Sequence, residues 1–341
     1  MAVFDAMNVD IIAIGEPMLE FNASEEGPLS EVGHFLVGWG GDTSNFAIAA
    51  SRAGGKAGYL TRLGDDEFGE SFMRLWKREG IDTSHVIRDP EAFTGIYFIS
   101  RAEGKHSFTY YRKNSAASRM TPDFLPGDYI RKAKLLHVSG ISQGISTSAC
   151  DTVFAAIETA KASGAMVSYD PNYRPRLWPF ERARAVIHET FRHADLVFPS
   201  LEDARALSGL SDPEEIVRFY LGMGPRVVVL KMGEDGALVG TEGQMGGDSA
   251  PGIRRFLPFK VKAVDASGAG DTFDGAFVVA YLSGWPLERC MYFANAAAAL
   301  TTTGFGCVTP VPRRDEIEAL MAQQAVSDQQ SVRQRRGGHS A

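Results

Sequence analysis

The sequence predicts an α/β fold, in which a mostly parallel β-sheet is covered by helices on both faces and a small second β-sheet forms a lid. Short apolar and β-branched runs alternate with amphipathic stretches, and this βαβ rhythm resumes after about residue 130. Between the two parts, residues 93–118 form two alternating runs joined by a turn, which is the pattern of a β-hairpin.

The first elements are a strand, a helix and a second strand. VDIIAIG is typical of a buried strand, TSNFAIAASRAG of a helix that Thr43 or Ser44 caps and Gly54 ends, and YLTRLG of a further strand. Later, AKLLHVSG, AMVSYDPN, DLVFPS and RVVVLKMG have the continuous apolar character of buried parallel strands. Helices such as Thr147 to Ala162 and Pro179 to Arg192 separate them.

The hairpin FTGIYFISRAEGKHSFTYYRKNSAAS turns at Ala102 to Lys105 and is expected to lie outside the main sheet. Together with the segment from Phe21 to Val37 it has the size of a sheet that covers a cleft. We therefore expect one domain over residues 1–326, with a discontinuous β lid at about 17–39 and 93–118. Residues 327–341 are polar and lack apolar periodicity, which predicts a solvated tail.

Composition excludes several classes of partner. Lys and Arg number 35 against 42 Asp and Glu, so no general basic field is available to bind nucleic acid or an anionic membrane surface. No run approaches the roughly 18 apolar residues of a membrane span. The three cysteines include no CxxC pair, which favours a reducing compartment, and we expect a cytoplasmic protein.

A glycine-rich turn opens the helix in VDASGAGDTFDGAFVVAYLSG. Gly268, Ala269 and Gly270 precede apolar residues at helical spacing. Free N–H groups and the positive end of the helix dipole bind anions at such a place, and glycine lets an oxyanion approach closely. The motif therefore predicts a phosphate site.

Asp271, in the first turn of this helix, has two readings. It can be a capping residue, because carboxylates are favoured at helix starts. It can also be the base that accepts the proton of an alcohol during phosphoryl transfer.

No other motif in the chain supports a competing activity. The chain has no GxxxxGK[ST] and no GxGxxG after its first strand. GISQG matches a hydrolase elbow at Ser142, but that elbow needs a helix at the serine, and we expect the helix to begin only near Ser146 to Ser148. His188 and His193 in HETFRH lie five residues apart, about 140° around a helix, so we expect surface residues and no zinc site.

DASGAGDTFDGAF, together with the early GWGGDTSNFAIAASRAG, resembles the ribokinase (PfkB-type) family of carbohydrate kinases over roughly residues 10–320. The resemblance implies a ribokinase-like, Rossmann-type three-layer core that binds ATP and Mg²⁺, and a lid that closes over the sugar. It implies that Asp271 is the base and that Gly268, Ala269 and Gly270 form the anion hole. It also places Gly41 and Asn45 against substrate hydroxyls, although Gly40 and Gly41 can equally be a turn before a helix.

Within that family, GEP, FTGIY, YYRKNSAAS, LHVSGIS and DPNYRPRLWP resemble the 2-keto-3-deoxygluconate kinases. The resemblance implies phosphorylation of a keto sugar acid that is contacted by Tyr97, Tyr110, Arg112, Ile141 and Arg174. The implied nucleotide contacts are Asn172, Tyr173, Arg174, Ser200, Lys231, Gly233, Gly236, Gly268, Gly270 and Asn295. The glycines at 233 and 236 also suit an ordinary hairpin turn, and Asn295 also suits a helix surface.

The chain departs from the family where an Asn-x-x-Glu element often helps to organise magnesium. Here the corresponding residues are Ser200 and Asp203, and Asp203 is expected to hold Mg²⁺ through water, while Ser200 is equally a helix cap. A requirement for a monovalent cation stays open. Fructokinase, another sugar or nucleoside kinase, and a non-catalytic sugar or nucleotide sensor remain as alternatives.

The segment YYRKNSAAS divides by the two-residue period of a strand. Tyr110 and Arg112 share one face, and Tyr111 and Lys113 share the other. We expect the first pair to reach inward to the substrate carboxylate and the second pair to face solvent or a partner subunit. The open side of the lid predicts a homodimer, or a higher homo-oligomer, formed through the lid sheet.

Overall fold

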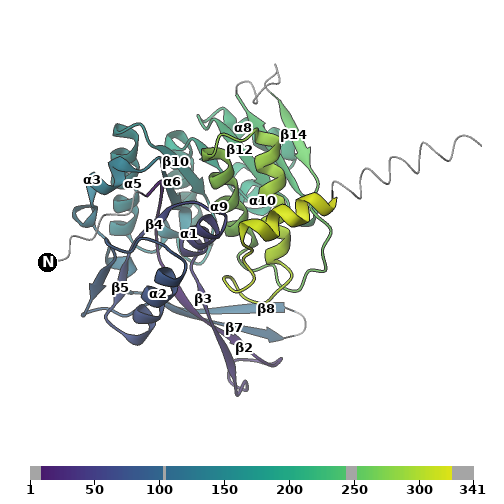
Figure 1. Cartoon of the computed structure of the whole chain (residues 1–341). Helices are drawn as coiled ribbons and strands as arrows, with labels where there is room; N and C mark the ends of the chain where they lie inside the picture. Colours follow the sequence, from purple (N-terminus) through teal and green to yellow (C-terminus); the bar gives the residue numbers. More distant parts are fainter. Residues whose placement is uncertain (1–8, 103–104, 243–251, 325–341) are drawn as a thin grey trace, which may run out of the picture.

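The main β-sheet has eight strands and is parallel except at one edge (Figure 1). The computed structural model describes residues 9–102, 105–242 and 252–324. The second-to-last strand in the chain pairs antiparallel with both of its neighbours, and all other neighbouring strands pair parallel. The strand order is β14 (Ile253–Phe256), β13 (Ala237–Thr241), β12 (Val227–Lys231), β11 (Leu196–Val197), β10 (Met166–Asp170), β9 (Leu135–Ser139), β1 (Ile11–Ile14) and β4 (Ala57–Leu60).

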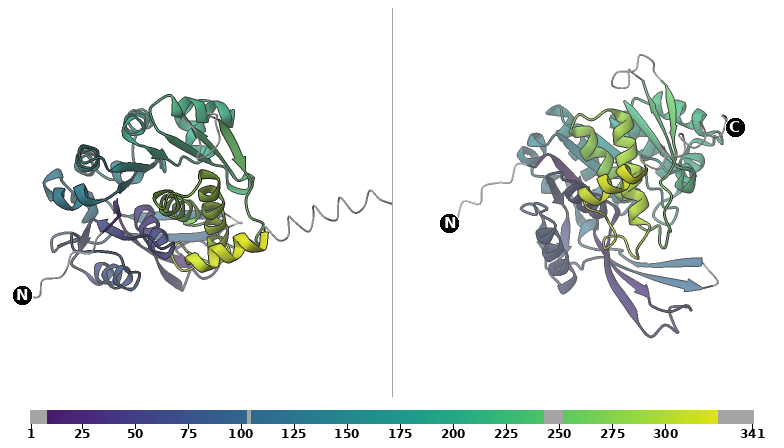
Figure 2. Two further views of the ribbon diagram at one scale, coloured as in Figure 1. Left: turned by 45° about the horizontal axis from the view of Figure 1, so that its top comes forward. Right: turned by 45° about the vertical axis from the view of Figure 1, so that its right-hand side comes forward.

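Helices cover both faces of this sheet (Figure 2). Alternate residues of β1 point to opposite sides, so that Ile11 and Ala13 belong to one apolar core and Ile12 and Ile14 to the other. The first core contains α1 (Asp42–Arg52), α2 (Glu67–Arg78), α9 (Ala269–Leu282) and α10 (Leu287–Thr301). The second contains α3 (Gly127–Lys132), α5 (Thr147–Ala162), α6 (Phe180–His193), α7 (Leu201–Ser208) and α8 (Pro213–Leu221). The predicted three-layer α/β core is thus confirmed.

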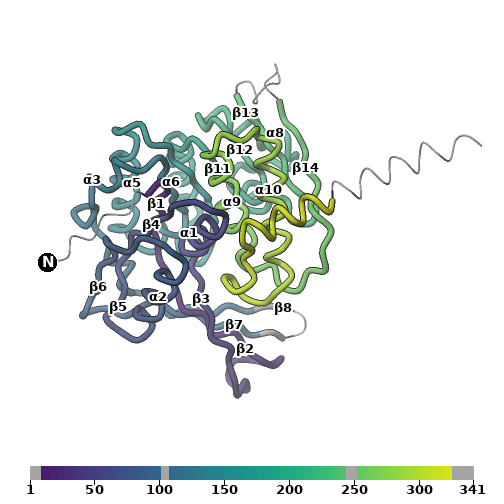
Figure 3. Tube along the Cα trace, in the orientation of Figure 1, coloured from purple at the N-terminus to yellow at the C-terminus, as the bar shows by residue number. Residues whose placement is uncertain are grey.

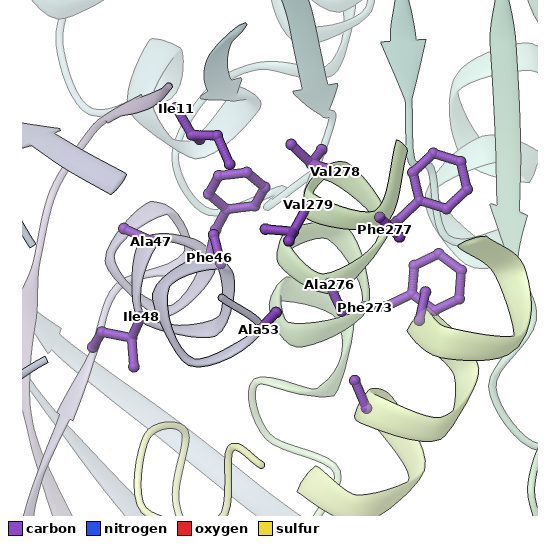
Figure 4. Packing of buried hydrophobic residues seen from close by; sticks show 14 of the residues in the cluster. Ile11, Phe46, Ala47, Ile48, Ala53, Phe273, Ala276, Phe277, Val278 and Val279 are labelled. Atoms are coloured by element: carbon purple, nitrogen blue, oxygen red, sulfur yellow. The ribbon is translucent and has the colours of Figure 1, made fainter. Parts of the chain in front are cut away.

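Helices α1 and α9 pack against each other at close range. A Cβ on Gly275 of α9 would lie 2.7 Å from the carbonyl oxygen of Phe46 in α1, so only glycine allows this approach. Figure 4 shows Phe46 of α1 and Ala53, just after this helix, on the side that faces Val279 and Ala276 of α9. This contact fixes the first turns of the two helices relative to each other.

The lid is a separate four-stranded sheet that extends away from the main sheet (Figure 2). Its order is β3 (Phe35–Gly40), β2 (Met18–Ala23), β7 (Ile96–Ala102) and β8 (Lys105–Tyr111), so β3 and β8 are its edges. The expected hairpin and its pairing with the early segment are both present. The predicted tail, residues 327–341, lies outside the described residues, and the extent of the domain stays a prediction.

Two local predictions in the first half were wrong. YLTRLG forms two strands that are interrupted at Thr61. After the interruption, Nη2 of Arg62 lies 2.8 Å from Oδ2 of Asp89. The second piece, β5 (Arg62–Gly64), pairs with β6 (Ile87–Asp89) in a small sheet beside α2 (Figure 3). Helix α1 is preceded by Gly41 as its N-cap and has no side-chain cap.

The helix after GISQG also differs from the prediction. A short helix, α4 (Gly140–Gly144), begins directly after β9 with Ser139 as its cap, and α5 follows with Ser146 as its cap. Ser142 is nevertheless fully buried and donates to the carbonyl of Ile14 at 3.2 Å, so it is no exposed nucleophile. Among the described helices, none is long and apolar enough to cross a membrane.

The histidines of HETFRH are not both at the surface, as the sequence suggested. His193 is exposed and lies 3.2 Å from Glu189. His188 is half-buried and packs against Phe219 and Tyr220, so its apolar contacts explain its position.

Candidate active site

The carboxyl ends of the parallel strands meet at one edge of the sheet, and polar residues gather there. Asp170 ends β10, Lys231 ends β12, and Glu16 follows β1. Ligands of open α/β sheets bind outside this edge. The sheet therefore brings together residues that are far apart in the chain.

The predicted anion site has the required backbone geometry. Gly268 is the N-cap of α9 with φ 72°, and a Cβ there would lie 2.8 Å from the carbonyl oxygen of Cys307, so the position requires glycine. The N–H of Ala269 makes a long bond of 3.3 Å to the carbonyl of Ala266. Among the described residues, the N–H groups of Gly270 and Asp271 have no protein acceptor, which leaves them for an anion.

Asp271 does not cap the helix. Its carboxylate accepts a hydrogen bond of 2.8 Å from Nδ2 of Asn45, the residue predicted to contact substrate hydroxyls. Burial, followed by the nearby charge of Asp42, raises the pKa of Asp271 to about 7. A carboxyl group with this pKa accepts a proton readily near neutral pH.

A buried ionic cluster lies directly behind the anion site. Nζ of Lys231 lies 2.8 Å from Asp170 and 3.0 Å from Asp274, and a Cβ on Gly270 would be 3.4 Å from the same nitrogen. Burial disfavours the charged form of Lys231, but the two carboxylates hold its pKa above the usual value. Lys231 thus supplies fixed positive charge behind the anion site.

The sequence reading missed Asp42, Asp170 and Asp274. Asp170 lies within the quoted DPNYRPRLWP, and Asp274 follows Asp271 by three residues, the spacing of neighbours on one helix face. Burial opposes ionisation of Asp170, but Lys231 lowers its pKa, whereas burial raises the pKa of Asp274. Their positions beside residues already singled out were the signals in the sequence that could have identified Asp170 and Asp274.

A cavity of about 460 Å³ lies beside Lys231, at the end of β12. It brings together three residues predicted to contact nucleotide, Ser200, Lys231 and Gly233, and its remaining lining residues are Leu201, Glu202, Arg205 and Met232. Gly236 has φ 85°, and a Cβ there would lie 2.0 Å from the carbonyl oxygen of Phe256. The hairpin-turn reading therefore accounts for Gly236, and its contact with nucleotide stays a prediction.

The loop after β10 connects the sheet edge to Asp203. The N–H of Asn172 bonds Asp170 at 3.0 Å, and the N–H of Tyr173 bonds Asp203 at 3.1 Å. Arg174 is exposed and donates to the carbonyl of Tyr173 at 3.2 Å. The three residues line the same edge, as expected of neighbours in one short loop.

Asp203 and Ser200 open helix α7. The cap reading of Ser200 is confirmed, because its Oγ accepts the N–H of Asp203 at 3.0 Å. Burial, followed by the charge of Asp170, raises the pKa of Asp203 to about 6. Within the described part of the chain, no three His, Cys, Asp or Glu side chains are grouped to enclose a metal ion. A lone carboxylate suits a cation held mainly by phosphates and water.

Asn295 lies inside the structure, so the helix-surface alternative was wrong. It is buried in α10, and its Nδ2 has no hydrogen-bond partner among the described residues. Ile141 is also buried, in α4. Gly41 has φ 102°, and a Cβ there would lie 2.4 Å from the carbonyl oxygen of Glu16, so the position requires glycine before any ligand is considered.

The inner face of the lid carries an aromatic stack. Tyr97 packs against Phe108 and Tyr110 with ring centroids 6.5 and 5.7 Å away. The guanidinium of Arg112 lies 5.8 Å from the Tyr110 ring, whereas Tyr111 contacts Phe98 on the other face. Tyr110 and Arg112 thus lie together, opposite Tyr111, as predicted, whereas Lys113 lies in the turn after β8 and its predicted face stays a prediction.

Two acidic residues under the lid were not singled out from the sequence. Glu20 accepts a hydrogen bond from the hydroxyl of Tyr97, and the Sγ of Cys307 lies 3.6 Å from the same carboxylate. Glu16 accepts from Nε of Arg112 at 2.7 Å, contacts Nη2, and accepts from Ser115. The Glu16 side chain is 0% exposed and that of Arg112 only 10%, so the lid arginine already has a buried carboxylate partner.

Comparison with known proteins agrees with this geometry. The family model for pfkB family carbohydrate kinases matches residues 8–314. The chain is 37% identical over 318 residues to 2-dehydro-3-deoxygluconokinase of Thermoproteus tenax, covering 92% of this chain and 94% of the relative. It is 33% identical to the Bacillus subtilis (strain 168) enzyme of the same name, covering 98% and 100%. It is also 33% identical to probable fructokinase-2 of Arabidopsis thaliana, covering 91% and 94%.

A solved structure shows the same fold with both expected small molecules. The putative ribokinase II of E. coli in complex with ATP and Mg²⁺ is 27% identical and superposes with a TM-score of 0.85, covering 92% of this chain and 99% of that chain.

Proposed function

Because the chain belongs to the pfkB family of carbohydrate kinases and is an ATP-dependent sugar kinase, we propose that its acceptor is 2-keto-3-deoxygluconate, also called 2-dehydro-3-deoxygluconate. The products are 2-keto-3-deoxy-6-phosphogluconate and ADP. The observation that carries the choice of acceptor is the position of Arg112 on the inner face of the lid, with its guanidinium held over Tyr110. The names of the two 2-dehydro-3-deoxygluconokinase relatives support the same acceptor.

The guanidinium of Arg112 has one nitrogen left to donate. Glu16 contacts both Nε and Nη2, Nη2 is itself buried, and among the described residues no hydrogen bond uses Nη1. A guanidinium nitrogen can donate a charge-assisted hydrogen bond to a second carboxylate. We assign Nη1 to the substrate carboxylate, with Tyr97, Tyr110, Ile141 and Arg174 as its predicted neighbours.

Asp271 is the proposed base. The terminal hydroxyl of the acceptor attacks the γ-phosphorus, the bond from that phosphorus to the bridging oxygen breaks, and the electron pair leaves with ADP. The hydroxyl proton passes to Asp271, which Asn45 orients. The turn at Gly268 to Gly270 presents the N–H groups of Gly270 and Asp271, which, with the charge of Lys231, stabilise the transferring group.

The nucleotide is assigned to the cavity at Ser200, Lys231 and Gly233, next to the anion site. Asn172, Tyr173 and Gly236 are further proposed contacts of the nucleotide. The Nδ2 of Asn295, which has no hydrogen-bond partner among the described residues, is the proposed donor to the adenine ring. Mg²⁺ bound to the nucleotide phosphates neutralises part of their charge, and Asp203 is the carboxylate proposed to hold its water.

A fructokinase is the second candidate, and one observation favours it. Glu16 neutralises Arg112, so the lid carries less positive potential than a free arginine would give. Without Arg112, the buried carboxylate of Glu16 would be left unpaired, which destabilises the fold. Arg112 can therefore be needed for stability alone, without contacting the substrate. The similarity to a plant fructokinase at 33% identity is compatible with this alternative.

A panel of acceptors separates the candidates. ATP consumption by the purified protein is measured with 2-keto-3-deoxygluconate, its galactose-derived epimer, fructose, ribose and adenosine. We expect the highest kcat/KM with a keto acid. Preference for fructose would establish the second candidate, and absence of turnover with every acceptor, despite ATP binding, would indicate a sensor.

A further inference from the structure

Asp42 has no role in the reaction described above, yet it lies next to the proposed base. It opens helix α1, three residues before Asn45, so the two side chains lie on neighbouring positions of one helix face. Asn45 bonds Asp271 at 2.8 Å, and α1 and α9 are held together by the close contact at Gly275. The first turns of two helices thus bring two carboxyl groups to one place.

Only one of the two carboxylate oxygens of Asp42 accepts hydrogen bonds among the described residues. Its Oδ2 accepts from the hydroxyl of Ser139 and, at 3.3 Å, from Nδ2 of Asn172. Its Oδ1 is buried and has no hydrogen-bond partner among the described residues. A buried carboxylate with an unpaired oxygen loses much of its stabilisation by water, so its protonated form is favoured.

The charged groups around Asp42 and Asp271 have partners of their own and do not shield the two carboxyl groups from each other. Asp170 and Arg112 act on Asp42, whereas Asp42, Asp170 and Lys231 act on Asp271, which also lies near the Cys307 thiol. Lys231 is bonded to Asp170 and Asp274, and Arg112 is bonded to Glu16. Burial raises the pKa of Asp42, and burial followed by Asp42 raises that of Asp271 to about 7.

We propose that Asp42 is a positioning residue for the base: in the free enzyme its negative charge opposes ionisation of Asp271, and Asp42 thereby sets the pH at which Asp271 becomes able to accept the acceptor's proton. Two carboxyl groups close together in a site that excludes water cannot both ionise easily, so their protons leave in two separated steps. This inference rests on Asp271 being the base, but it does not depend on which sugar is the acceptor.

The test is the pH dependence of kcat/KM, which reports ionisations of the free enzyme. With the best acceptor of the panel, Asp42→Asn should shift the acid limb to lower pH by about one unit, because a neutral amide no longer opposes ionisation of Asp271. Asp89→Asn is the matched control, since Asp89 is a buried aspartate paired with Arg62 away from the site. It should leave the limb in place even if it lowers stability.

An acid limb at the same pH in wild type and Asp42→Asn would overturn the proposal, even if the variant is slower at every pH. If Asp42→Asn does not fold, carboxyl-carbon NMR titration of the wild type and of Asp271→Asn replaces it. We expect two linked titrations in the wild type, and a single one at lower pH for Asp42 in the variant. An unmoved Asp42 titration would contradict the proposal, whereas a fully active Asp271→Asn would instead refute the proposed base.

Discussion

Asp271 is half-buried and is the proposed base, so its effects on stability and on catalysis can be measured in one variant. Its pKa of about 7 in the folded protein lies above the value in the unfolded chain. As the pH rises from about 4 to 7, the carboxyl group ionises first in the unfolded chain, so the free energy of unfolding falls. Asp271→Asn should lower kcat by roughly a thousandfold. It should raise Tm relative to wild type more at pH 8, where the wild-type carboxylate is ionised, than at pH 6.

Calorimetry at the two pH values and steady-state kinetics check this prediction. Binding of ATP, measured by titration calorimetry, is the control and should be preserved. A Tm difference that is equal at pH 6 and pH 8 would mean that Asp271 ionises without the expected penalty of burial.

Arg112 and Lys113 offer a matched pair of adjacent cations on the lid. Arg112 is held between Glu16 and the Tyr110 ring, whereas Lys113 is exposed. Arg112→Ala should raise KM for the keto acid by about tenfold or more, because a charge-assisted contact is lost. Lys113→Ala should change it less than twofold. Equal effects would place the carboxylate elsewhere or show that the substrate is not an acid.

At the level of single residues, the sequence predicted what local patterns encode. The Gly268 turn and Asp271 are neighbours in the chain, so their arrangement was visible in the sequence. The bonds of Arg112 to Glu16 and of Lys231 to Asp170 join residues 96 and 61 positions apart. Such pairings depend on how the strands are ordered in the sheet, which no local motif reports.

At the level of elements, helix α9 has a glycine with left-handed backbone at each end, and only the first lies at the proposed anion site. Replacing each glycine separates the conformational cost of a side chain from its effect on function. Gly268 has φ 72° and Gly284 has φ 73°, but a Cβ would contact Cys307 only at Gly268. Gly284→Ala should cost about 1–2 kcal/mol of stability and leave kcat intact. Gly268→Ala should cost more and also lower kcat, because the anion site must shift.

Denaturant unfolding and kinetics of both variants provide the measurement. Full activity in a folded Gly268→Ala variant would show that the turn tolerates displacement and does not bind the transferring group.

Elements with strong periodicity were predicted well, and those decided by tertiary contacts were not. Helix α5 was predicted at its observed bounds, because its apolar spacing and its cap agree. Thr43 and Ser44 were expected to cap α1. Instead their hydroxyls bond Tyr59 and Trp76, so tertiary contacts override a local preference.

At the level of the whole molecule, we predict a homodimer formed through the lid. Leu36 and Val37 on the edge strand β3 are 61% and 60% exposed, and an apolar cavity of about 390 Å³ lies between Phe68, Phe93, Ile96 and Tyr111. Exposed apolar residues on a sheet edge favour pairing with a second copy. Sedimentation velocity should show a dimer for wild type and a monomer for Val37→Glu.

Leu257→Glu is the matched control for this experiment, because Leu257 is equally exposed but lies outside the lid. It should remain dimeric. A monomeric wild type at micromolar concentration would refute the dimer without affecting the proposed chemistry.

Recognition of a substrate carboxylate by Arg112 would distinguish this sugar kinase from a fructokinase. The most direct measurement compares kcat/KM for 2-keto-3-deoxygluconate with that for its amide, in wild type and in Arg112→Ala. We predict that wild type prefers the acid by about tenfold or more and that Arg112→Ala loses most of this preference. Equal rates for acid and amide in wild type, or an unchanged preference in the variant, would contradict the account.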